Sequence, residues 1–148
     1  MIDYQKILDQ NLLNVFKDIL KEIKKNGVSN GNQLYVTFIS SHKNVKIPNW
    51  LIEKYPEEMT IVIQHEYYNL EINKEYFTIN LSFNDIMANL EIGFDSIISF
   101  ADPFANFGLK FNKTDKIISR KIKNLKVRNK DNVVNFSNYK KINLDNND

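Results

Sequence analysis

Cysteine is absent from this chain of 148 residues. Its absence excludes disulfide bonds, a thiol nucleophile and any zinc site or iron–sulfur cluster that cysteine would hold. Long apolar runs are missing too, because none approaches the ~18 residues that a membrane-spanning helix requires. The acidic residues Asp3 and Asp9 make the start of the chain unlike a signal peptide. We therefore expect a cytoplasmic protein that does not associate with a membrane.

Catalytic and metal-binding motifs are missing as well. The sequence has no glycine-rich phosphate loop, no nucleophile elbow and no zinc-protease helix motif. His42 and His65 are far apart, and neither stands at metal-ligand spacing from a pair of carboxylates. Glu57 and Glu58 are adjacent, so in an extended chain they point to opposite faces and are not expected to share a proton. We predict a protein that is not an enzyme and that uses no cofactor or metal.

Charge is distributed unevenly along the chain. Residues 1–111 hold ten Lys or Arg against fourteen Asp or Glu, whereas residues 112–148 hold ten against four. A basic tail provides affinity for phosphates that does not depend on sequence, and small barrels bind single strands through exposed aromatic rings. The acidic body and its inward-facing aromatic residues argue against nucleic acid as the main partner. An Sm-like module that binds RNA or single strands through its tail remains the alternative function.

The segment from Asp3 to Lys25 predicts an amphipathic helix, because its apolar residues recur at spacings of three and four. Asp3 is the expected N-cap, and Asn26-Gly27 the expected stop. The apolar stripe is wider than a two-stranded seam requires. One part could cover the barrel while another part meets a second chain, or the whole stripe packs on its own domain. The residues considered for a dimer seam are Leu13, Phe16 and Leu20.

Short segments rich in β-branched and aromatic residues fill the chain between Pro56 and Phe111. Apolar and polar residues alternate in several of them, which indicates strands with one wet face. The pattern predicts a mainly β fold, a small antiparallel barrel or sandwich that follows the helix. In the strand expected at 86–92, the residues that face the core begin with Ile86. We expect Trp50 and Leu51 to plug one end of the barrel. Strands are expected at 33–40, 59–65, 67–73, 76–83, 86–92, 98–104 and 107–111, with a turn at Asn84-Asp85.

The character of the sequence changes after Phe111. Residues 112–130 are rich in Lys and Asn and have only scattered apolar side chains, which is typical of a flexible linker. An apolar island follows at 131–141, and it is a candidate docking peptide because exposed apolar residues in a disordered tail are costly without a use. We therefore divide the chain into a folded body at 1–111, a basic linker at 112–130 and a disordered tail at 131–148.

Several strings of this sequence follow a pattern known from one protein family. They are Lys54-Tyr55-Pro56-Glu57-Glu58-Met59-Thr60-Ile61-Val62, Gln64-His65, Leu81-Ser82-Phe83-Asn84, Asp102-Pro103, Phe107-Gly108-Leu109-Lys110-Phe111 and Asn132-Val133-Val134-Asn135-Phe136. These strings resemble the SspB family, bacterial adaptors that deliver ssrA-tagged proteins to the ClpXP protease. The similarity is greatest to the alpha-proteobacterial branch, and it extends over nearly the whole chain except the linker. A departure occurs at 94–97, where the family often has a stretch rich in Pro or Ala.

This resemblance implies an Sm-like barrel with an N-terminal helix, a homodimer, and a groove that binds ssrA-type tags on substrate polypeptides. It also implies a tail that docks on the N-terminal domain of the ClpX unfoldase. Gln64 suits a tag peptide because its amide both donates and accepts hydrogen bonds. For Phe83 and Phe100, ordinary core packing is the alternative. The expected tag-binding residues are Gln64, Met59, Phe83, Phe100, Ala101, Phe104, Phe107 and Gly108, and the expected ClpX-docking residues are Val133, Val134, Phe136, Tyr139 and Lys140.

Overall fold

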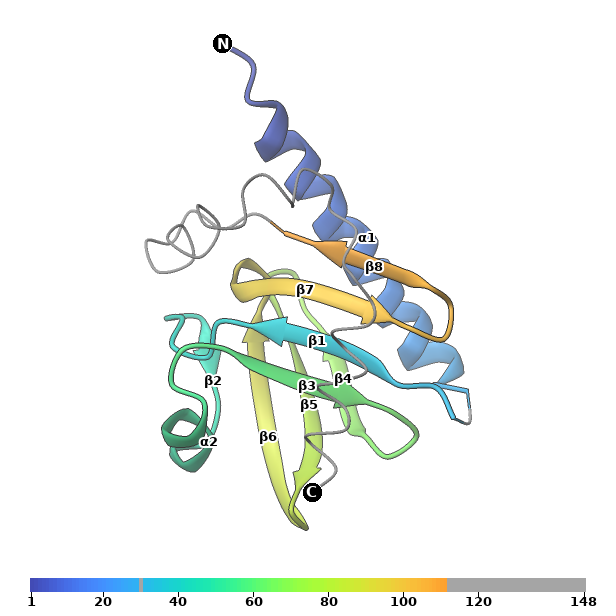
Figure 1. Ribbon diagram of the computed structural model, residues 1–148, viewed down its shortest axis with the longest axis vertical. Helices are drawn as coiled ribbons and strands as arrows, with labels where there is room; N and C mark the ends of the chain where they lie inside the picture. Colours follow the sequence, from blue (N-terminus) through green and yellow to red (C-terminus); the bar gives the residue numbers. More distant parts are fainter. Residues whose placement is uncertain (30, 112–148) are drawn as a thin grey trace.

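A computed structural model describes residues 1–29 and 31–111 of the chain (Figure 1). One long helix comes first, and short strands with a small helix follow it, so the prediction of a mainly β fold with an N-terminal helix is confirmed. In chain order the elements are α1 (Tyr4–Asn26), β1 (Leu34–Phe38), β2 (Val45–Lys46), α2 (Asn49–Lys54), β3 (Met59–Ile63), β4 (Tyr68–Ile72), β5 (Tyr76–Phe83), β6 (Ile86–Gly93), the 3-10 turn η1 (Phe94–Ser96), β7 (Ile97–Asp102) and β8 (Phe107–Lys110).

The strands form two four-stranded antiparallel sheets, one in the order β3-β1-β7-β8 and the other in the order β2-β6-β5-β4. Alternation sends apolar side chains to one face in β3, where Met59, Ile61 and Ile63 are buried and Thr60 and Val62 are half-buried. The apolar faces of the two sheets meet in one shared core. The body is therefore a two-sheet form of the predicted barrel or sandwich.

The limits of α1 follow from its capping residues. The Asp3 carboxylate accepts a hydrogen bond from the Lys6 backbone N–H at 3.1 Å, which satisfies one of the free donors of the first turn. At the other end Gly27 adopts φ 74°, a conformation that favours glycine, and its N–H donates to the Ile23 carbonyl at 2.7 Å. The predicted N-cap and the predicted stop are both confirmed.

Phe16 joins α1 to both sheets. Its ring contacts Phe77 of β5 at a centroid distance of 6.0 Å, Phe100 of β7 at 5.7 Å and Phe111 at 6.3 Å. These tilted and edge-on contacts are the geometry that aromatic pairs prefer. Phe16 and Leu20 are completely buried in this core. Their placement corrects the prediction of a seam at these two residues, since neither side chain is available to a second chain.

The small helix α2 lies between β2 and β3, and its two apolar residues have different environments. Leu51 is buried in the core as expected. Trp50 is not a plug, because 38% of its surface is exposed and its ring lies against the edge of Phe83 at 6.3 Å. The reason is the position of Trp50 beside the end of the β5–β6 hairpin, where the two sheets no longer cover it.

The β5–β6 hairpin turns tightly at Asn84-Asp85. Both residues have positive φ, 51° and 66°, as a two-residue type I′ turn requires. The register pairs Phe83 with Ile86 across this turn, which confirms its predicted position. Ile86 was expected to face the core, yet its side chain is 55% exposed because it stands at the tip of the hairpin, beyond the core.

The predicted linker at 112–130 and the predicted docking residues lie outside the described part of the chain. Within the described part, no helix is both long and apolar enough to cross a membrane.

Candidate functional site

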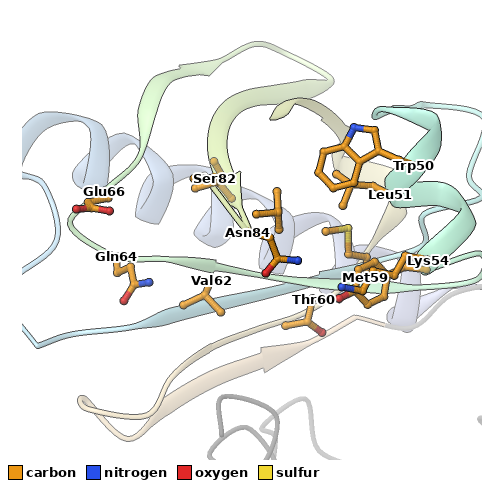
Figure 2. A pocket seen from close by; sticks show the side chains of 13 residues that line it. Trp50, Leu51, Lys54, Met59, Thr60, Val62, Gln64, Glu66, Ser82 and Asn84 are labelled. Atoms are coloured by element: carbon orange, nitrogen blue, oxygen red, sulfur yellow. The ribbon is translucent and has the colours of Figure 1, made fainter. Parts of the chain in front are cut away.

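A groove of about 220 Å³ runs along β3, between this strand, α2 and the tip of the β5–β6 hairpin (Figure 2). β3 is the last strand of its sheet, so no other described strand pairs with its outer edge. An edge strand presents unpaired backbone N–H and C=O groups that can pair with another extended chain. The groove is lined by Trp50, Leu51, Lys54, Tyr55, Met59, Thr60, Val62, Gln64, Glu66, Leu81, Ser82, Phe83 and Asn84.

The middle of the groove is apolar. Leu51, Met59 and Leu81 contribute to its floor from three different elements, and each is almost fully buried. Trp50 and Phe83 add a wall of two rings in edge-to-face contact. Figure 2 shows Trp50 and Leu51 on the α2 side, across from Val62 of β3. This shape can accept one apolar side chain of a ligand beside the strand edge.

Polar groups flank this apolar centre. Figure 2 shows Lys54 at one end of the groove and Glu66 near Gln64 at the other end. The Thr60 hydroxyl lies 2.7 Å from that of Thr37 on β1. Hydroxyl and amide groups from Thr60, Ser82, Asn84 and Gln64 therefore surround the apolar floor, and such groups fix the orientation of a bound chain.

Gln64 belongs to a short chain of hydrogen bonds on the outer face of the same sheet. Its side-chain oxygen accepts from Gln33 Nε2 at 3.2 Å, and Gln33 Oε1 accepts from the Tyr35 hydroxyl at 2.9 Å. Burial raises the pKa of the Tyr35 hydroxyl above its ordinary value.

Three of the sequence-predicted tag-binding residues come together in this groove: Gln64, Met59 and Phe83. The other five belong to β7, β8 and the turn that joins them, and none of them lines the groove. The cause is the strand order, because β1 separates β7 and β8 from β3.

The five remaining residues have two different environments. Phe100, Ala101 and Gly108 are buried, with Phe100 packed on Phe16, so the core alternative holds for Phe100. Phe104 and Phe107 are exposed, at 81% and 41%, at the turn between β7 and β8. The segment 100–107 therefore does not line the groove along β3, whose apolar wall comes from α2 and the β5–β6 hairpin.

Several groove residues were not predicted as site residues, among them Lys54, Val62 and Asn84. Thr60 and Val62 alternate with the core residues of their strand, and this pattern could have predicted that their side chains lie on its outer face. Nothing local in the sequence shows that β3 is an edge strand or that the β5–β6 hairpin reaches it. These facts depend on contacts between distant parts of the chain.

A second cavity of about 400 Å³ lies beside Leu13 of α1. Four lysines line it together with three carboxylates, and some of these charges pair with each other, as Lys46 does with Glu91 at 3.7 Å. Because positive and negative side chains are nearly equal in number, the cavity favours neither an anionic nor a cationic ligand. Among residues 1–29 and 31–111, no group of histidine and carboxylate side chains is arranged to hold a metal ion.

A family model described as SspB, stringent starvation protein B, matches residues 6–142. The match spans α1, both sheets and most of the sequence that follows β8. A search of curated proteins finds no match to the chain.

Proposed function

The chain belongs to the stringent starvation protein B (SspB) family, and on this premise we propose that it is a cytoplasmic adaptor of the ClpXP protease. Its substrates are polypeptides that carry ssrA-type degradation tags, and the tag binds in the groove along β3. The observation that carries the proposal is the unpaired edge of β3 beside an apolar, concave wall. The adaptor holds its substrate without performing chemistry on it.

The groove suits a peptide in extended form. Such a peptide adds a strand to the open edge of β3, and its backbone then gains hydrogen-bond partners. Alternate side chains of the peptide point toward the floor formed by Leu51 and Met59, where one of them is removed from water. Gln64 and Asn84 offer amide groups that can pair with the peptide backbone or with a tag asparagine.

Delivery requires a second contact. On the sequence-based prediction that 112–130 is a flexible linker, its 19 residues span ~25 Å on average, from about 5–6 Å times the square root of length. A weak contact of Val133, Val134, Phe136, Tyr139 and Lys140 with the ClpX N-terminal domain then raises the local substrate concentration to the order of millimolar.

Pairing of two chains involves the exposed part of α1. Tyr4, Leu8 and Val15 are exposed apolar residues spaced by four and seven positions, so they lie on one face of the helix. Leu13, the one accessible member of the predicted seam, is half-buried and packs against the core on a different side of the helix from this stretch. We place the homodimer contact on this exposed stretch rather than on Phe16 and Leu20.

Single-strand RNA binding gains no support from the described residues. The groove carries one lysine and one glutamate, Lys54 and Glu66, and so lacks a positive field. The large aromatic cluster around Phe16 is internal and offers no stacking surface. Binding of single-stranded RNA in a gel shift at physiological salt, without affinity for a tag peptide, would favour this alternative.

The first test is titration calorimetry of the full chain with an ssrA-type peptide. Val62→Lys places a charge in the groove, and we expect it to weaken binding at least about tenfold through desolvation of that charge. Thr78→Lys, a half-buried position on β5 that does not line the groove, is the matched control and should bind like the wild type. Absence of wild-type binding, or equal binding by both variants, would refute the groove.

The second test separates binding from delivery. Deletion of 133–141 should leave tag affinity unchanged and remove the enhancement of ClpXP degradation of a tagged substrate, because only the tether is lost. Unchanged degradation by the truncated protein would show that this segment does not dock on ClpX.

A further inference from the structure

The orientation of the Gln64 amide decides what the groove can recognise at this position. A primary amide donates through nitrogen and accepts through oxygen, so the two orientations select opposite ligand groups. The oxygen of Gln64 is occupied by Gln33 Nε2 at 3.2 Å. Its nitrogen has no hydrogen-bond partner among the described residues, and in Figure 2 it lies on the side of Val62.

Gln33 has the same two possible orientations, and its own partner determines which one it takes. The Tyr35 hydroxyl donates to Gln33 Oε1 at 2.9 Å, which leaves Gln33 Nε2 to face Gln64. If the Tyr35 hydroxyl accepted a hydrogen bond from Gln33 instead, the Gln33 amide would be flipped, with its oxygen facing Gln64. The Gln64 amide would then have to flip as well, so that its nitrogen could donate to that oxygen. Hydrogen bonds in such a chain are coupled, so one hydroxyl sets the polarity of both amides.

We propose that Tyr35 and Gln33 are positioning residues which fix the Gln64 amide with its nitrogen toward the groove, so that the groove selects a carbonyl or carboxylate oxygen of the ligand there. The inference rests on the proposed function, since the ligand is the tag peptide. Tyr35 and Gln33 do not line the groove. They act only through Gln64.

The pairing of β1 with β3 supports this chain of hydrogen bonds. Tyr35 and Gln33 lie on or beside β1, and β1 pairs with β3 in a register that places Tyr35 opposite Val62 and Leu34 opposite Ile63. The sheet itself therefore holds Gln33 next to Gln64.

The test is a double-mutant cycle on the full chain, with affinity for an ssrA-type peptide measured by calorimetry. We expect Tyr35→Phe to weaken binding about fivefold, the effect of one net hydrogen bond. Gln64→Met should weaken it at least as much, and Tyr35→Phe should cause no further loss in the Gln64→Met background. An equal fivefold loss in both backgrounds would overturn the proposal, because Tyr35 would then act independently of Gln64.

Tyr67→Phe is the matched control. Its hydroxyl donates to the Ile23 carbonyl at 3.0 Å, so the variant also loses one tyrosine hydrogen bond, but none connected to Gln64. We expect its peptide affinity to equal that of the wild type. A fivefold loss in this control would attribute the effect of Tyr35→Phe to general loosening of the fold and overturn the proposal.

A measurement without ligand keeps the two proposals separable. In the free protein, Tyr35→Phe should shift the side-chain amide resonances of Gln33 and Gln64 in a ¹H–¹⁵N spectrum, whereas Tyr67→Phe should leave them in place. If the wild type binds no peptide but these shifts occur, the proposed function fails and the coupling stands. If Tyr35→Phe leaves the Gln64 resonances unchanged, the coupling is refuted whatever the peptide does.

Discussion

Phe16 shows how one residue can be assigned to two different roles from sequence. Its position on the apolar stripe of a helix fits both a core and a dimer seam, and only its surroundings decide. Four phenylalanine rings, those of Phe77, Phe94, Phe100 and Phe111, lie within 6.3 Å of its own ring centroid. This enclosure makes Phe16 part of the core.

Phe16→Ala should therefore lower the free energy of unfolding by about 3–5 kcal/mol, because it removes a ring and leaves a cavity. Urea unfolding checks the loss, and light scattering of the folded fraction should give the same mass as the wild type. If Phe16→Ala changed the mass seen by light scattering but not the free energy of unfolding, Phe16 would belong to the dimer contact and not to the core.

Tyr35 should make stability depend on pH in the alkaline range. Burial raises its pKa in the folded protein above the unfolded value of 10.0, so its contribution is fully present below about pH 10 and is lost as pH rises through the folded value. The urea midpoint of the wild type should fall more between about pH 8 and about pH 11 than that of Tyr35→Phe.

The wild type has to be compared with Tyr35→Phe, because Lys110 changes the stability with pH in the opposite direction. Burial lowers the pKa of Lys110, so its contribution to stability rises with pH up to its unfolded value of 10.5. Both proteins keep Lys110, so their difference isolates Tyr35. Parallel pH profiles would show that the Tyr35 pKa is not raised by folding.

At the scale of elements, the β5–β6 turn has a strict backbone requirement. Asp85 has φ 66°, a region that β-branched residues enter only at a cost. Asp85→Val should lower the free energy of unfolding by about 1–2 kcal/mol, whereas Asp85→Asn should leave it nearly unchanged, since Asn tolerates this conformation. Urea unfolding distinguishes them, and equal stabilities would contradict the type I′ assignment.

Local signals explain which elements could be predicted. Asp3, Gly27 and Asn84-Asp85 act through backbone geometry within a few residues, and the helix limits and the turn were predicted correctly. The groove depends on strand order and on the reach of the β5–β6 hairpin toward β3, which no local pattern encodes. Gln64, chosen for its amide, lines the groove, whereas Phe100 lies in the core, which was its alternative; core and groove phenylalanines look alike in sequence.

At the scale of the whole molecule, the exposed apolar stretch of α1 predicts a dimer. Leu8→Glu places a charge where 44% of an apolar side chain is exposed, and we expect it to halve the mass seen by light scattering from about twice 17.4 kDa. Met87→Glu, on the exposed face of β6, is the control and should keep the wild-type mass. A wild-type mass of one chain would exclude this pairing.

The contact between Phe16 and Phe111 also has a consequence for synthesis. One ring belongs to the first element of the body and the other follows its last strand, with both sheets between them in sequence. The helix emerges from the ribosome first, but the rings that enclose it come from β5, η1, β7 and Phe111. The core therefore stays open during most of translation, and an apolar helix face remains exposed to chaperones until Phe111 has emerged.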